Sequence, residues 1–171
     1  HWTALELKRF FGIDEPLSEK TAESIWSRCN EQLATREFSC RNLLTRSEVR
    51  VVCSTDDPTD TLEHHQAVAA LKDFSVKVYP TFRPDAGMRL DDLAAWNAWA
   101  DKLASVSGEA CDTLDSFLGA LRKRHDFFHS LGGRLSDHGL TAMDTETATD
   151  AEAKDIFDRA RVGKSISASD I

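Results

Sequence analysis

The stretch Gly132-Gly133-Arg134-Leu135-Ser136-Asp137-His138-Gly139 places a short strand-like segment and a polar cluster directly after a strong helical pattern. Two earlier stretches share this order, because residues 49–53 lead into the polar segment 54–58 and residues 76–79 lead into the segment 80–85. Repeated strand-then-helix units form parallel sheets, whose strands deliver their carboxyl ends to one face, where α/β enzymes place their chemistry. We therefore expect one site to contain Asp56, Asp57, Arg83, Asp137 and His138.

Composition limits the classes of partner. With 171 residues, of which 41% are hydrophobic and 29% charged, the chain is long enough for a domain with a substantial core. The formal net charge is −8, and no basic run is longer than Arg122-Lys123-Arg124. Nucleic acids and anionic membranes require a concentrated basic surface, so we expect neither as a partner. No apolar run approaches the roughly 20 residues that span a bilayer.

The four cysteines indicate the compartment. Cysteines 29, 40, 53 and 111 are scattered and include no C-x-x-C pair. This spacing favours neither a zinc finger nor a disulfide framework. Reduced thiols, and hence a cytoplasmic protein, are the expectation.

The hydrophobic pattern divides the chain into two segments. Residues 1–47 have helical spacing and no strand signal, and we expect a helical insertion segment in which Ser18 caps a helix. In residues 48–171, strands alternate with helices. The predicted strands span 49–53, 76–79 and 134–136, the predicted helices span 59–71, 91–104, 112–129 and 151–161, and a loop covers 141–150.

Three aspartates stand where these helices are predicted to begin. Asp57, followed by Pro58 at the first helical position, is expected to cap the first helix after a strand, and Asp91 and Asp112 the next two. The resulting fold class is helix-rich α/β: a partial TIM-type barrel with about three parallel strands and an N-terminal helical segment. Since an open arc leaves sheet edges exposed, a second copy of the chain could complete it as a homo-oligomer.

Four sequence blocks occur in a fixed order along the chain. They are HWTALELKR (residues 1–9) with Phe11-Gly12-Ile13, then Thr55-Asp56-Asp57-Pro58, Arg83-Pro84-Asp85 and Ser136-Asp137-His138-Gly139. Their order and spacing resemble the central portion of the uronate isomerase (glucuronate isomerase) family, in the amidohydrolase superfamily of distorted TIM barrels. The resemblance implies interconversion of hexuronates and ketohexuronates through an enediol, such as D-glucuronate with D-fructuronate and D-galacturonate with D-tagaturonate. Family members are much longer, so we expect the isolated chain to be inactive.

The resemblance also implies a cofactor, a divalent metal that we expect to be zinc. In the family, a His-x-His pair, a further His and an Asp hold or surround this metal. The present chain contains no H-x-H motif, so we expect no metal ligand in it. The neighbouring pairs His64/His65 and His125/His129 lie on predicted amphipathic helices, where such side chains are more often surface or partly buried residues than ligands.

Each candidate site residue has a functional and a structural interpretation. Arg83 suits a uronate carboxylate or a developing oxyanion, because guanidinium binds carboxylate through two parallel hydrogen bonds; the structural alternative is a salt bridge with Asp85 or a neighbouring helix. Asp137 suits proton transfer or hydroxyl orientation, or it caps the segment that follows. His138 is an acid or base candidate, or a side chain hydrogen-bonded to backbone.

Asp56 and Asp57 are further candidates, with helix capping as the alternative for at least one of them. A different class of function also stays open for the whole chain. A free-standing helical α/β module derived from this fold would act in binding or structure and not in catalysis. A tight uronate complex without metal, or a stable assembly with another protein, would favour that alternative over the isomerase.

Overall fold

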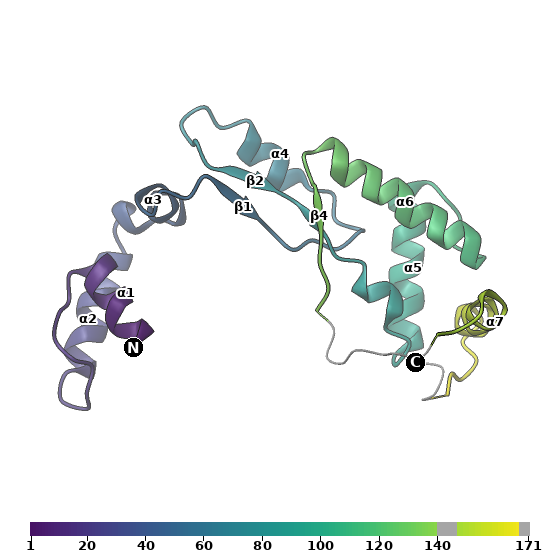
Figure 1. Ribbon diagram of the computed structural model, residues 1–171, viewed down its shortest axis with the longest axis horizontal. Helices are drawn as coiled ribbons and strands as arrows, with labels where there is room; N and C mark the ends of the chain where they lie inside the picture. Colours follow the sequence, from purple (N-terminus) through teal and green to yellow (C-terminus); the bar gives the residue numbers. More distant parts are fainter. Residues whose placement is uncertain (140–146, 168–171) are drawn as a thin grey trace. The chain divides into compact units, whose positions relative to one another are not determined.

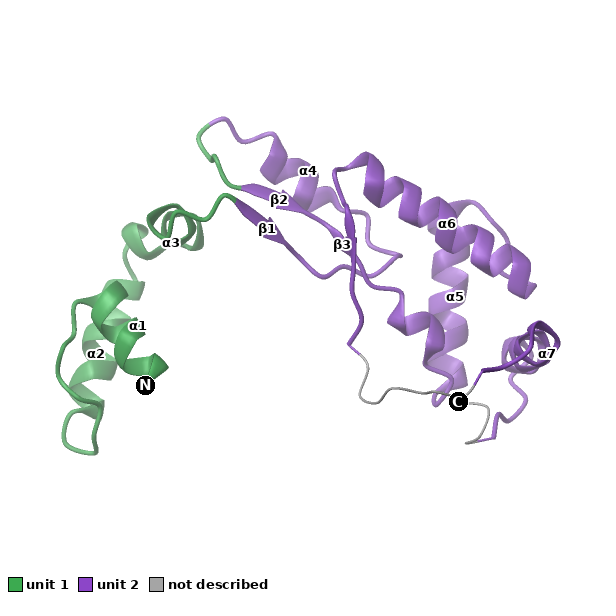
Figure 2. Ribbon diagram, in the orientation of Figure 1, with its two compact units in different colours: residues 1–50, 73–76 green, residues 51–72, 77–171 purple. Residues whose placement is uncertain are grey.

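The computed structural model describes residues 1–139 and 147–167, and the described chain forms two compact units (Figures 1 and 2). Unit 1 comprises residues 1–50 and 73–76, and unit 2 comprises residues 51–72 and 77–171. Residues 141–146 of the predicted loop lie outside the described residues. No helix in the described ranges has the length and apolar composition needed to cross a membrane.

Unit 1 is helical, as its sequence pattern predicts. Its elements are α1 (Trp2–Phe11), α2 (Ala22–Leu33), the 3-10 helix η1 (Arg36–Phe38) and α3 (Cys40–Arg46). Gly12 ends α1 in the left-handed conformation, with φ 67°, and its N–H donates to the carbonyl of Lys8. Leu7, Ile13 and Ile25 form the core of this unit, with Phe11 and Cys29 packed against them.

The prediction that Ser18 caps α2 is wrong. The helix begins at Ala22 with Thr21 at the N-cap, and Ser18 lies in the preceding turn. The Thr21 hydroxyl donates to the carbonyl of Pro16 at 2.7 Å and accepts from the Ser18 N–H at 2.9 Å. These bonds stabilise a turn over residues 16–21, which delays the start of the helix.

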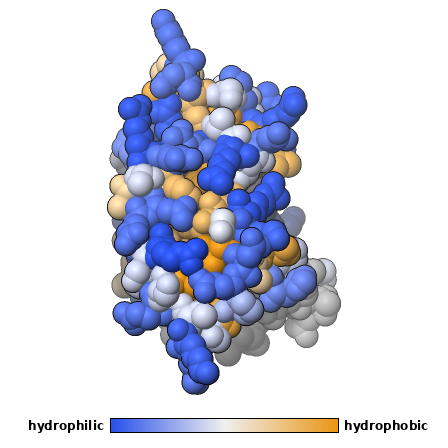
Figure 3. Space-filling view, turned by 90° about the vertical axis from the view of Figure 1, so that its left-hand side faces the viewer, coloured by the Kyte–Doolittle hydropathy of each residue, from blue (hydrophilic) through white to orange (hydrophobic). Residues whose placement is uncertain are grey.

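The surface of unit 1 carries both apolar and hydrophilic side chains. Figure 3 shows apolar patches interrupted by hydrophilic side chains. Large apolar side chains of unit 1 that are exposed are Trp2, Leu5, Leu17, Trp26 and Leu33. Isolated exposed apolar residues of this kind are normal on a folded surface.

Unit 2 is helix-rich α/β with parallel strand pairing, as predicted. Its strands are β1 (Val51–Cys53), β2 (Lys77–Tyr79), β3 (Thr81–Phe82) and β4 (Leu135–Ser136). Its helices are α4 (Glu63–Ala69), the 3-10 helix η2 (Asp85–Met88), α5 (Leu93–Ser107), α6 (Leu114–Ser130) and α7 (Asp150–Arg161). Strand β1 pairs with β2, and β3 pairs with β4, in both cases parallel. Helix α4 packs on β2, and α6 on β3 (Figure 1).

The segment after β2 forms an additional short strand that was not among the three predicted ones. Pro80 separates β2 from β3, because proline has no N–H to donate to a strand ladder. Beyond it the chain pairs again, since Asp56 forms a parallel bridge with Phe82. The Asp56 N–H donates to the Thr81 carbonyl, and the Arg83 N–H donates to the Asp56 carbonyl, each at 3.0 Å. These bonds place the residues that follow β1 beside β3.

The three aspartate caps were predicted wrongly. Helix α4 begins at Glu63, six residues after Asp57, whose Oδ1 accepts from the Thr59 N–H at 2.8 Å in a local turn. Helix α5 is capped by Asp92, and α6 by Thr113, each one residue after the predicted position. Thr113 forms a reciprocal capping box with Ser116, in which each side chain accepts from the backbone N–H of the other residue.

The main core of unit 2 lies between α5, α6 and α7. Phe117 is 5% exposed, and its ring centroid lies 5.9 Å from that of Trp96 and 5.3 Å from that of Phe157. Ala100, Leu103, Cys111, Ala120 and Ala160 complete the buried cluster. Burial raises the pKa of the Cys111 thiol, so this cysteine stays protonated and packs as an apolar side chain.

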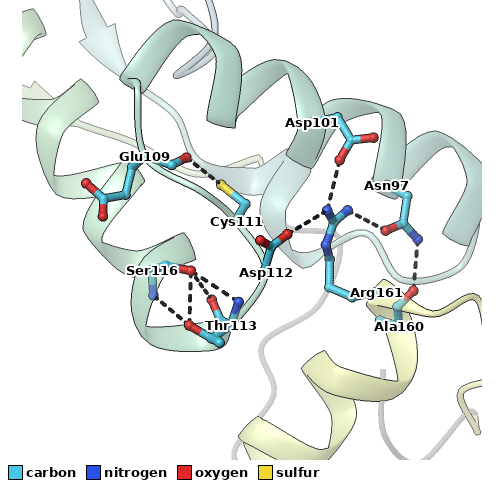
Figure 4. A network of polar contacts seen from close by, with 9 residues as sticks. All are labelled: Asn97, Asp101, Glu109, Cys111, Asp112, Thr113, Ser116, Ala160 and Arg161. Atoms are coloured by element: carbon cyan, nitrogen blue, oxygen red, sulfur yellow. Dashed lines mark hydrogen bonds and ion pairs between the residues drawn. The ribbon is translucent and has the colours of Figure 1, made fainter.

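A polar network joins α7 to α5 beside this core (Figure 4). Arg161 donates to the Asn97 Oδ1 at 2.6 Å and to the Asp101 Oδ1 at 2.9 Å. The Asn97 amide in turn donates to the carbonyl of Ala160 at 2.8 Å. Asn97 and Arg161 each form more than one of these hydrogen bonds. Together the bonds fix the position of the end of α7 along α5.

Arg124 of α6 holds the loop that follows β1. Its Nε donates to the carbonyl of Pro58 and its Nη2 to that of Asp60, each at 2.7 Å. The guanidinium carbon also lies 4.1 Å from the ring centroid of Phe127. Burial lowers the pKa of Arg124, with the nearby Asp60 acting in the opposite direction. The loop between β1 and α4 is therefore hydrogen-bonded to α6, the helix that packs on β3.

Gly132 is required at the turn into β4. Its φ is 96°, and a Cβ added there would lie 2.6 Å from the Tyr79 ring. We expect Gly132→Ala to lower the free energy of unfolding by about 2 kcal/mol or more, from backbone strain together with steric overlap. The matched control is Gly119→Ala within α6, where the nearest atom would be 3.9 Å away. That substitution is expected to stabilise by about 0.5–1 kcal/mol. Urea unfolding checks both, and equal effects would contradict the prediction.

Candidate functional site

Arg83 and Asp137 meet at the carboxyl ends of two paired strands. The register of β3 and β4 aligns Phe82 with Ser136, so the residues that follow these two positions are neighbours. The Arg83 Nε donates to the Asp137 Oδ1 at 3.1 Å, and its Nη2 donates to Oδ2 at 2.5 Å. Both side chains are about one third exposed, at 35% for Arg83 and 40% for Asp137. The pair therefore faces solvent at the end of the sheet.

Each member of this pair stabilises the charged form of the other. The hydrogen bond from Arg83 is the largest cause that holds the pKa of Asp137 below its usual range. The same bond raises the pKa of Arg83. Asp137 is thus a carboxylate whose two oxygens are both occupied by the guanidinium. These bonds use the Nε and Nη2 of Arg83.

His138 pairs with a carboxylate that was not among the predicted site residues. Its Nδ1 lies 2.6 Å from the Oδ1 of Asp85, the first residue of η2. The Asp85 Oδ2 accepts from the Gly139 N–H, also at 2.6 Å. Asp85 is buried, whereas the His138 side chain is 48% exposed. From the sequence, Asp85 was predicted only as a salt-bridge partner of Arg83, although its position in Arg83-Pro84-Asp85 places it at the same strand end.

The electrostatics of Asp85 favour its ionised form. Burial is the largest influence and raises its pKa, but the hydrogen bonds from Gly139 and His138, together with the nearby charge of Arg83, outweigh it. The net result is a pKa below the usual range. Gly139 is closely packed in this cluster, because a Cβ there would lie 3.2 Å from the Arg83 Nη1 and 3.5 Å from the Asp85 Oδ2. The four side chains and this glycine form one polar cluster at the ends of β3 and β4.

The side chain of Asp56 belongs to a separate cluster. Its Oδ2 accepts from the Ser54 hydroxyl at 2.7 Å and from the Thr81 N–H at 3.2 Å. Its Oδ1 lies 3.6 Å from the Nε2 of His65, which is also 2.7 Å from the Ser54 Oγ. These contacts connect the end of β1 to α4 and to β3. Sequence reasoning did not anticipate His65 there, since the contact depends on how α4 packs.

Asp57 has a structural role. Both of its oxygens accept from the Nε1 of Trp99, at 3.0 and 2.9 Å, and Oδ1 also accepts from Thr59. The carboxylate thus joins the loop after β1 to α5. Of the five predicted site residues, the structure brings Arg83, Asp137 and His138 together. Asp56 and Asp57 are turned toward other partners.

The remaining histidines are occupied or exposed. The His64 side chain is 93% exposed, the His125 ring packs edge-on against Phe82 at 5.3 Å, and the His129 Nδ1 lies 3.4 Å from Arg134. Among residues 1–139 and 147–167, no three His, Cys, Asp or Glu side chains are grouped so as to hold a metal ion. The described residues therefore do not supply a ligand set for the divalent metal that the family resemblance implies.

Comparison with known proteins identifies the family. The glucuronate isomerase family model matches residues 1–171. The chain is 47% identical over 163 residues to a uronate isomerase of Solibacter usitatus. The aligned region covers 95% of this chain and 35% of that protein. It is 47% identical over 171 residues to a uronate isomerase of Bacteroides thetaiotaomicron, covering 100% of this chain and 36% of the relative.

Two solved structures have the same arrangement. A uronate isomerase from Thermotoga maritima superimposes with a TM-score of 0.84 at 35% identity, covering 99% of this chain and 37% of that one. A glucuronate isomerase from Caulobacter crescentus superimposes with a TM-score of 0.85 at 28% identity, covering 99% and 35%. The chain spans about a third of the length of these relatives. Sequence and structure agree over this span, and the chain belongs to the glucuronate isomerase family.

Proposed function

We propose that this chain supplies part of the active site of a hexuronate isomerase, in which Arg83 and His138 act on the substrate and Asp137 orients Arg83. The observation that carries the proposal is the parallel pairing of β3 and β4, which brings these three side chains together at the strand ends. In TIM-type barrels the chemistry lies at this end of the strands, and we propose such a barrel for the complete protein. D-glucuronate and D-galacturonate are the proposed substrates, since the relatives are named uronate and glucuronate isomerases.

In the proposed chemistry, a cation binds the substrate and a histidine transfers the proton. Arg83 binds the uronate carboxylate or the developing oxyanion through its Nη1 and the remaining N–H of Nη2. Asp137 orients the guanidinium by occupying its Nε edge. His138 carries the proton from C2 of the aldose to C1, while the C2 hydroxyl proton passes to the C1 oxygen, which converts aldose to ketose through an enediol. Its exposed side chain can reach a bound substrate.

The complete protein that contains this chain provides the test. Incubation with D-glucuronate and with D-galacturonate in deuterium oxide, followed by NMR, is expected to show the corresponding ketoses with deuterium at C1. D-glucose, which lacks the carboxylate, serves as the control and is expected not to react. Absence of any hexuronate conversion would contradict the proposed function. Conversion at an unchanged rate by His138→Gln would instead contradict the proton-carrier role of His138.

A further inference from the structure

We infer that Asp85 is a positioning residue, which holds His138 in the tautomer with hydrogen on Nδ1 and directs Nε2 toward the substrate. The inference rests on the proposed function and deepens it, because it assigns the group that prepares His138 for proton transfer. Asp85 itself does not touch the substrate in this scheme, since it is 8% exposed. A histidine that transfers protons needs its second nitrogen to be held by another group.

The geometry of Asp85 fits this role on both oxygens. Oδ1 lies 2.6 Å from the His138 Nδ1, and Oδ2 accepts from the backbone N–H of the next residue, Gly139. One carboxylate thus holds the ring and the backbone beside it, so the ring has little freedom to turn. The ring end that carries Nδ1 meets a buried group, whereas the side chain as a whole is half-exposed. The anchored nitrogen is therefore Nδ1, and Nε2 is the nitrogen left for a ligand.

The charge state of Asp85 selects the tautomer. An ionised carboxylate accepts hydrogen bonds but cannot donate them, so the hydrogen between Asp85 and His138 must reside on Nδ1. The neutral imidazole then has its lone pair on Nε2, as a general base requires. Among the described residues, the other charged groups at this strand end are Arg83 and Asp137, which neutralise each other through two hydrogen bonds. Asp85 is accordingly the carboxylate that is hydrogen-bonded to the His138 ring.

A purely structural salt bridge is the competing explanation, and Asp85→Asn separates the two. An asparagine at this position can satisfy both neighbours in only one orientation, with its carbonyl accepting from Gly139 and its NH₂ group donating to Nδ1. The opposite orientation would direct the NH₂ group at the Gly139 N–H. The isosteric variant therefore keeps the loop hydrogen-bonded while moving the hydrogen of His138 to Nε2. A structural role predicts little change in catalysis from this variant.

The experiment measures both tautomer and kinetics in the complete protein. Protein labelled with ¹⁵N-histidine, with His138 assigned by comparison with His138→Gln, is expected to show Nδ1–H in the wild type and Nε2–H in Asp85→Asn. We expect kcat for the hexuronate to fall about a hundredfold while KM changes less than threefold, because the lost step is proton transfer. Asp85→Glu, which restores a carboxylate, is expected to recover part of kcat.

The control is Asp101→Asn, which alters an exposed carboxylate paired with Arg161 and should leave kcat and the His138 tautomer unchanged. Retention of Nδ1–H in Asp85→Asn, or a kcat within threefold of the wild type, would overturn the inference. Failure of the proposed function is a separate result. If the wild type converts no hexuronate, the proposed function fails, while the histidine spectra still decide whether Asp85 sets the tautomer.

Discussion

Replacing Arg83 with alanine in the complete protein is expected to lower kcat/KM for a hexuronate at least a hundredfold. The substitution removes the only side-chain cation hydrogen-bonded to Asp137 among the described residues and leaves that carboxylate facing the substrate's own negative charge. Arg83→Lys is expected to retain part of the activity, since lysine keeps the charge but lacks the planar pair of donors. Steady-state kinetics on D-glucuronate and D-galacturonate measure the effect.

Arg134→Ala provides a matched control for this prediction. Arg134 precedes β4, at the opposite end of the strand from Asp137, and its Nη1 donates to the carbonyl of His129 at 3.0 Å. Loss of an arginine there is expected to change kcat/KM less than threefold. Near-normal activity of Arg83→Ala would remove Arg83 from the site. An equal loss in both variants would show that the effect is a general loss of stability.

Phe117→Ala is expected to lower the free energy of unfolding of unit 2 by about 3–5 kcal/mol, the range for a large aromatic side chain in a core. Phe117 of α6 contacts Trp96 of α5 and Phe157 of α7, so its removal leaves a cavity that three helices border. A Cβ at Gly87 would lie 3.3 Å from the Phe117 ring, which shows how closely η2 packs on it. Asp85 is the first residue of η2, so the core supports the site.

Leu118→Ala is the control, because the neighbouring Leu118 is 37% exposed on the same helix. Its truncation is expected to lower the free energy of unfolding by less than about 1 kcal/mol. Urea titration with tryptophan fluorescence reports on both variants, since Trp96 and Trp99 lie in or beside this core. A loss below about 1.5 kcal/mol for Phe117→Ala would mean that the three helices do not form one cooperative core.

Much of the site was predictable from local sequence. Strand-like runs that each lead into a polar segment predicted parallel strands with Arg83, Asp137 and His138 at their ends. The parallel pairing and the meeting of these three side chains agree with that expectation. Local pattern was sufficient because the carboxyl ends of parallel strands lie at the same edge.

Other assignments depended on contacts that are distant in sequence. Asp57 resembles a helix cap in Asp57-Pro58, yet its carboxylate accepts from Trp99, 42 residues later. Asp85 looked like a partner for Arg83, yet it is bonded to His138, 53 residues later. A carboxylate can accept hydrogen bonds from several neighbouring donors with similar free energy. Which of these bonds forms depends on the donors that surround the carboxylate in the folded chain.

The sequence alone therefore indicated the family, the helix-rich α/β character and the parallel strands, and it predicted that Arg83, Asp137 and His138 lie near one another. Hydrophobic periodicity, turn residues and ordered motifs are local properties, which can be read without knowing which segments meet. Only the tertiary structure decided that Arg83 pairs with Asp137, that Asp85 holds His138, and that Asp56 and Asp57 face elsewhere. Those partnerships follow from the register of β3 with β4 and from helix packing, because a shift of one residue would exchange the neighbours of every side chain.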